Sequence, residues 1–113
     1  MDNGYIERVD SVERHIIDQV IKDVLATGHL IDVADGNSFL GKPSNVPHDI
    51  QSLIGHTDTT VLTFETGEGV IIGHVVFLHG KGADVIEDHS NEEFTENVLR
   101  NAKAIAVALL TGC

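Results

Sequence analysis

The sequence predicts an α+β domain in the order αββαββα, with a four-stranded antiparallel sheet packed with helices and a long C-terminal helix. Three observations predict this fold. Two segments carry apolar residues at helical spacing behind capping-box patterns, two pairs of strand-like segments are each joined by a glycine-containing turn, and a glycine stands where each of the first two helices should end. The 113 residues are expected to form a single domain, 1–113, with residues 1–9 as a flexible N-terminus.

The first two helices are delimited by end signals in the sequence. The first should begin at an Asp-Ser-Val-Glu pattern, in which the Asp10 side chain accepts a hydrogen bond from the first turn and the Glu13 side chain reaches back to the cap. Apolar residues then recur at helical spacing as far as Leu25. Gly28 and Gly55 are the expected stops of the first and second helices, because glycine takes the left-handed conformation after a helix without a Cβ penalty.

Each of these helices is followed by a predicted hairpin. In the first hairpin, residues 29–34 and 38–41 flank an Asp-Gly-Asn turn, whose residues tolerate positive φ. In the second, residues 57–66 and 70–79 flank a Gly-Glu-Gly turn. Residues 70–79 are apolar on both faces, which predicts a central strand with cover on both sides.

The last helix is predicted from residue 91 to about residue 110, behind a capping box formed by Ser90 and Glu93. Its second half is apolar almost all round, and a helix that is apolar on every face must be buried on every face. In a chain of this size the simplest cover is a second copy or another partner. We therefore expect a homodimer whose interface is formed by Phe94, Val98, Ala102, Ile105, Ala106, Leu109 and Leu110.

The charge of the chain restricts its partners. With 18 acidic and 7 basic residues, the formal net charge of −11 repels phosphate backbones, so direct binding to nucleic acid or to an anionic membrane surface is not expected. A basic protein surface is favoured instead, including one built to hold nucleic acid. The one cysteine, the absence of a signal-peptide pattern in the first 15 residues and the short length of the longest apolar run, residues 104–110, predict a cytoplasmic protein.

Ligand chemistry is concentrated in residues 78–90, where a Gly-Lys-Gly sequence is followed by acids and a histidine. A phosphate-binding loop and a metal site are two interpretations, but neither the Walker spacing nor a metal-ligand spacing is present. A connecting turn is therefore favoured, in which Gly80 and Gly82 supply positive φ and residues 84–89 form an edge segment. Five side chains here are candidate ligand-binding residues: His79, Lys81, Asp84, Asp88 and His89.

No catalytic residue, metal ligand or cofactor is predicted. The chain has no G-x-S-x-G, H-E-x-x-H or C-x-x-C pattern, and the EF-hand spacing fails as well. The acidic residues and histidines are of the types that acid–base catalysis uses, but their spacing matches no catalytic pattern. The sequence leaves catalysis open and favours binding.

Several stretches resemble small uncharacterised proteins encoded by tailed phages and prophages. The resemblance rests on a helix ending at Ala-Thr-Gly before an Asp-Gly hairpin, on residues 57–60 (TDTT), on the glycine-entered strand 72–80 (IGHVVFLHG) and on residues 84–91 (DVIEDHSN), and it covers roughly residues 16–99. This chain has His89 where the resembled proteins carry an aromatic residue.

The resemblance implies a phage accessory protein in the host cytoplasm that binds a host protein stoichiometrically, for example to inhibit a host defence system. Two alternatives stay open. One is a protein that binds or cleaves a small nucleotide in a pocket between two copies, with Lys81 and His79 contacting the ligand. The other is a minor virion or assembly component.

Overall fold

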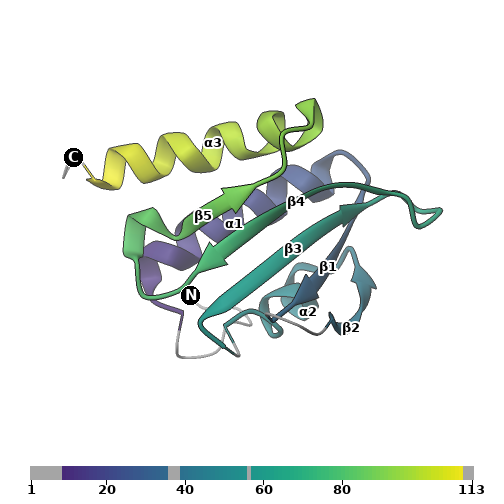
Figure 1. Cartoon of the computed structure of the whole chain (residues 1–113), viewed down its shortest axis with the longest axis horizontal. Coiled ribbons are helices and arrows are strands. Elements are labelled where there is room, and N and C mark those ends of the chain that lie inside the picture. Colours follow the sequence, from purple (N-terminus) through teal and green to yellow (C-terminus); the bar gives the residue numbers. More distant parts are fainter. Residues whose placement is uncertain (1–8, 36–38, 56, 111–113) are drawn as a thin grey trace.

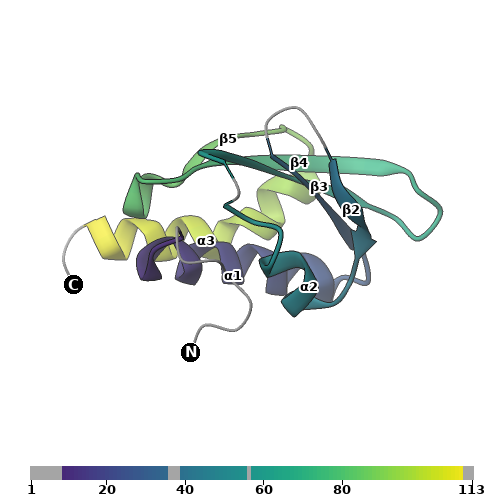
Figure 2. The ribbon, with the colours of Figure 1, turned by 90° about the horizontal axis from the view of Figure 1, so that it is seen from below.

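A five-stranded antiparallel sheet forms one layer of the molecule and three α-helices form the other (Figures 1 and 2). The structure, a computed structural model, describes residues 9–35, 39–55 and 57–110. The strand order in the sheet is β2-β1-β3-β4-β5. Along the chain the elements are α1 (Ser11–Ala26), β1 (Leu30–Ala34), β2 (Phe39–Ser44), α2 (Pro47–Gln51), β3 (Thr59–Glu65), β4 (Ile71–Leu78), the 3₁₀ turn η1 (Gly82–Asp84), β5 (Ile86–His89) and α3 (Glu93–Leu110).

The predicted α+β class, both hairpins and the long C-terminal helix are confirmed, but the sheet has five strands and not four. The added strand, β5, pairs with β4 through Val75–His89 and Val76–Asp88. The sequence predicted residues 84–89 as an edge segment, and β5 does lie at the edge of the sheet. It was not counted as a strand, because its four residues, three of them polar or charged, are too few to show an alternation.

The core lies between the sheet and the helices. Helices α1 and α3 pack side by side beneath the sheet, where α3 contacts β4 and α1 contacts β1, while α2 packs against β1 and β2 (Figure 2). The largest fully buried side chains include Phe64 and Phe77 from the sheet and Ile16 and Ile17 from α1. Residues 1–8 of the predicted flexible N-terminus lie outside the described residues, whereas Val9 is fully buried in this core.

One expectation about β4 is wrong. Its second face, which includes Ile72, His74 and Val76, was expected to be covered, yet all the helices of the described residues lie on the opposite face of the sheet (Figure 2). These side chains are half-buried, and Ile72 packs in part against the core. We call this side of the sheet the helix-free face.

The end signals of α1 are confirmed. The Asp10 carboxylate accepts a hydrogen bond from Glu13 N at 2.9 Å, and Gly28 has a φ of 85° just beyond the helix. Gly55 also has a positive φ, of 90°, but it is not the stop of the second helix, because α2 already ends at Gln51 with Ser52 as its C-cap. The Gly-Asn part of the first hairpin turn, residues 36–37, lies outside the described residues.

The start of α3 differs from the capping-box prediction. The helix begins at Glu93, because Glu92 O accepts the first helical hydrogen bond, from Glu96 N at 3.1 Å. The Ser90 hydroxyl instead accepts from His74 N at 3.0 Å and lies 2.9 Å from Thr95 Oγ1. These bonds tie the first turn of α3 to the middle of β4.

No helix of the described residues is long and apolar enough to cross a membrane.

Candidate functional site

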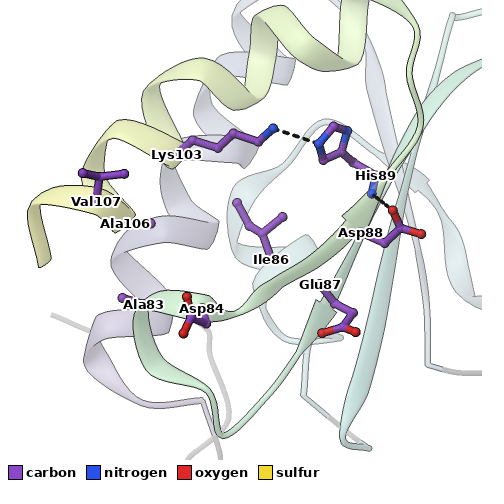
Figure 3. Close-up of a pocket in the computed structure, with 9 residues that line it drawn as sticks. All are labelled: Ala83, Asp84, Ile86, Glu87, Asp88, His89, Lys103, Ala106 and Val107. Carbon is purple, nitrogen blue, oxygen red and sulfur yellow. Dashed lines mark hydrogen bonds between the residues drawn. The ribbon is translucent and has the colours of Figure 1, made fainter. Parts of the chain in front are cut away.

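A groove of about 440 Å³ lies between the edge strand β5 and helix α3 (Figure 3). Its lining comes from η1, β5 and the second half of α3. The residues that line it are Ala83, Asp84, Ile86, Glu87, Asp88, His89, Lys103, Ala106 and Val107.

The groove has an apolar floor and a charged rim. Ile86 and His89 point from β5 toward α3, whereas Glu87 and Asp88 stand on the other side of the strand (Figure 3). Val107 is 60% exposed and leaves an open apolar surface on the helix side. Three carboxylates and one ammonium group line the groove, so its charge is negative when His89 is neutral.

His89 is held by a defined set of hydrogen bonds. Its Nδ1 lies 2.8 Å from Ser90 O, so Nδ1 carries the proton and donates it to that carbonyl. Its Nε2 is therefore the acceptor for Lys103 Nζ at 2.8 Å. The His89 backbone N–H donates to the Asp88 carboxylate at 2.8 Å and so is not used to pair with a strand.

The structure brings together three of the five predicted ligand-binding residues: Asp84, Asp88 and His89. The other two, Lys81 and His79, are not part of the groove lining. Lys103 joins the site from α3, and no sequence pattern connects it with His89. Three of the residues predicted at a dimer interface, Phe94, Val98 and Ala102, pack against the core of the chain itself.

The homodimer stays a prediction, and the surface left for it is the end of α3. Ile105 and Ala106 are partly buried against the core, and Leu109 is 38% exposed. The side chain of Leu110 lies outside the described residues.

The backbone of the Gly-Lys-Gly turn binds a carboxylate, and this carboxylate is the side chain of Glu13 from the same chain. The Glu13 carboxylate is fully buried. Its Oε2 accepts from Gly80 N at 2.8 Å and from Gly82 N at 3.0 Å, while its Oε1 accepts from His79 Nδ1 at 3.0 Å. The predicted positive φ values of Gly80 and Gly82 are confirmed at 91° and 58°. Glu13 was predicted as a capping side chain, but these bonds carry it to the far end of β4.

The histidine of this cluster continues into a second hydrogen bond. His79 Nε2 lies 2.7 Å from Thr60 Oγ1, which itself accepts from Gly55 N at 3.1 Å. Because His79 Nδ1 donates to the Glu13 carboxylate, the Nε2 of a neutral imidazole is an acceptor, and the Thr60 hydroxyl donates to it. Every group of the cluster is then satisfied.

Carboxylate, imidazole and hydroxyl are connected here in the order of a hydrolase triad. Glu13 and Thr60 are fully buried and His79 is only 8% exposed, so a substrate has no access to the hydroxyl. The cluster is a structural clamp between α1, β3 and the turn after β4. Both ring nitrogens of His79 are occupied, so the residue is not placed to contact a nucleotide.

Two carboxyl groups lie close together on the helix-free face. Asp32 on β1 and Glu65 on β3 are each 9% exposed. Burial, followed by the charge of Asp32 and a hydrogen bond with it, raises the pKa of Glu65 above its usual value. Asp32 Oδ1 is buried and has no hydrogen-bond partner within the described part of the chain.

Replacing Glu65 with glutamine is expected to stabilise the protein at pH 7 but not at pH 4. Because the pKa of Glu65 is higher in the folded state than the unfolded value of 4.5, wild-type stability falls as the pH rises above 4.5 through the folded pKa. Glutamine has no proton to lose and can donate its amide to Asp32. Thermal unfolding at both pH values measures the effect, with Glu68→Gln in the exposed β3–β4 turn as the matched control. An equal change of Tm at pH 4 and pH 7 would contradict the expected linkage.

Known proteins supply no further assignment of the site. Among residues 9–35, 39–55 and 57–110, no group of three or more His, Cys, Asp or Glu side chains is placed to hold a metal ion. Comparisons with protein-family models, with curated proteins and with solved structures find no match for this chain.

Proposed function

We propose that this protein acts by stoichiometric binding of a basic protein partner in the groove between β5 and α3. The observation that carries the proposal is the combination of an apolar floor with three carboxylates at the open edge of a sheet. The net charge of −11 adds a long-range attraction for a basic partner, which speeds association and disfavours acidic competitors.

The outer edge of β5 supports an extended segment as the bound element. β5 is the last strand of the sheet order, and no strand of the described residues pairs with its outer side. The His89 N–H, which bonds to the Asp88 carboxylate, becomes available to a partner carbonyl when Asp88 turns to a basic side chain. A segment that adds to an exposed strand takes its affinity from main-chain hydrogen bonds and its specificity from side-chain contacts.

The resemblance to small phage proteins supports a more specific form of the proposal. In this form the chain is a phage-type accessory protein of the host cytoplasm, and its partner is a host protein whose basic surface it occupies. Occupation of a surface that normally holds nucleic acid would inhibit that host protein, for instance a component of a defence system.

The test is capture of a partner from a host-cell lysate by the tagged protein, followed by mass spectrometry and a direct affinity measurement. We expect one dominant basic protein, bound about tenfold more weakly by the double variant Asp84→Asn/Asp88→Asn and with full affinity by the control Glu68→Gln. Raising the salt concentration should weaken wild-type binding more than variant binding. Equal affinities of the wild type and the double variant would remove the groove from the proposed function.

A further inference from the structure

The groove between β5 and α3 is bridged at one end by two side chains. Lys103 reaches from α3 toward β5, where its Nζ lies 2.8 Å from His89 Nε2 (Figure 3). At the other end, Ala83 and Asp84 belong to η1, the turn that leads into β5. A chain segment that lies along the groove from the η1 end therefore meets this bridge and must end there or turn out of the groove.

The two ends of the groove differ in charge. Lys103 is exposed at the bridged end, and Asp84 is exposed at the η1 end (Figure 3). Between them lies the apolar floor, formed by Ile86, Ala106 and Val107. A ligand with a negative group at one end, a positive group at the other and apolar side chains in between matches this order.

The ammonium group of Lys103 has donors to offer to a ligand. An ammonium group has three N–H donors, and the bond to His89 uses one of them. His89 Nδ1 donates to Ser90 O, so Nε2 stays an acceptor and holds the ammonium group at the end of the groove. Glu87 and Asp88 stand on the other side of β5 from the floor (Figure 3). A charged donor in this position suits a carboxylate.

We propose that the groove binds the carboxyl-terminal segment of the basic partner, with the terminal carboxylate on Lys103 and an upstream basic residue on Asp84. The inference rests on the proposed function, because it names the part of the partner that enters the same groove. A terminal carboxylate fits at the bridge, since no chain has to continue past it. An internal segment would have to turn out of the groove there and would leave Lys103 without a carboxylate.

The length of β5 sets the spacing between the two charges of the ligand. Its four residues span about 10 Å at a rise of about 3.3 Å per residue. An extended segment that runs parallel to β5 covers this length with its last four residues. Side chains alternate in direction along such a segment, so the last residue and the third from the end both face the floor. The basic residue is then expected at the fourth position from the end, nearest Asp84.

Three acetylated peptides test the inference on the full chain. The first is Gly-Ser-Arg-Val-Ala-Val with a free carboxyl end. The second has the same sequence with an amide end, and the third continues through two added glycines to an amide end. NMR titration at pH 7, read at the backbone amide signals of Asp84, His89 and Ala106, gives the affinity of each peptide for the groove.

We expect the peptide with the free carboxyl end to bind about fivefold more tightly than the other two, because the Lys103 ammonium group is exposed to solvent. Lys103→Gln should remove this preference, so that the three peptides bind alike. Asp84→Asn should weaken all three peptides and leave the preference in place, and the control Glu68→Gln should change neither quantity. The amide spectra also establish that each variant is folded.

The possible failures separate the inference from the proposed function. Equal affinities of the three peptides for the wild-type groove would overturn the inference and leave the proposed function standing, because the groove would then accept internal segments. A preference for the free carboxyl end that survives in Lys103→Gln would overturn it as well, since another group would hold the carboxylate. The absence of a saturable shift in the groove with all three peptides would remove both proposals.

Discussion

Replacing Glu13 with alanine is expected to lower the free energy of unfolding by about 3 kcal/mol or more. The substitution removes the acceptor for three N–H groups, from His79, Gly80 and Gly82. Water can reach the two glycine amides, which lie nearer the surface, but the His79 ring is buried and its Nδ1–H loses its partner. Since small domains have a total stability of about 5–15 kcal/mol, a loss of this size is a large part of the whole.

Urea unfolding of the wild type and the variant measures this loss through the shift of the midpoint at constant m-value. Asp10→Ala is the matched control, because it removes another carboxylate of the same helix end but only a capping bond, with an expected cost of about 1 kcal/mol. If Glu13→Ala costs no more than Asp10→Ala, the clamp contributes little beyond a helix cap.

Replacing Gly73 with alanine is expected to destabilise the protein by about 3 kcal/mol. A Cβ atom at this position would overlap Thr95 Oγ1, and it would lie 3.3 Å from Ser90 Oγ and 3.4 Å from Phe64 Cδ2. Thr95 and Phe64 are fully buried, so neither can move aside without disturbing the packing of α3 on β4. The cost arises from packing alone, because the φ of Gly73 lies outside the left-handed region.

A double-mutant cycle tests the origin of this cost. Thr95→Ala removes the overlapping oxygen, so Gly73→Ala should cost much less in that background, and the coupling energy should reach about 1–3 kcal/mol. Gly67→Ala is the control: nothing lies within 4 Å of its would-be Cβ atom and its φ is ordinary, so the change should be neutral or slightly stabilising. Additive effects of Gly73→Ala and Thr95→Ala would show that the close approach is not the cause.

Local signals in the sequence were sufficient to predict most of the fold. Asp10 and Gly28 mark the ends of α1 because capping depends on neighbours within one turn, and the hairpins follow from alternation on either side of tight turns. Residues 84–89 were predicted as an edge segment but not counted as a strand of the sheet, because the pairing of β5 with β4 depends on the tertiary structure and not on a pattern of its own four residues.

The site shows the same division between local and distant information. Asp84, Asp88 and His89 lie within six residues of one another, so the sequence indicated that they would be neighbours. The contacts from His89 to Lys103 and from Glu13 to His79 span 14 and 66 residues, and no residue pattern signals them. Glu13 was assigned to a capping box, since the same local spacing fits both roles. For Gly73 a signal existed, because a glycine inside a strand often marks a close approach of another segment.

The clamp at Glu13 also constrains the order in which the chain can fold during synthesis. α1 is made first, but the groups that hydrogen-bond its buried carboxylate belong to residues 79–82, and the helix that packs beside it, α3, is made later still. Until those segments leave the ribosome, the apolar stripe of α1 has no permanent cover and is exposed to chaperones and to aggregation. Closing contacts across so many residues also slows folding relative to a helical bundle of equal size. Ribosome-stalled chains that end before residue 79 should therefore be protease-sensitive along α1.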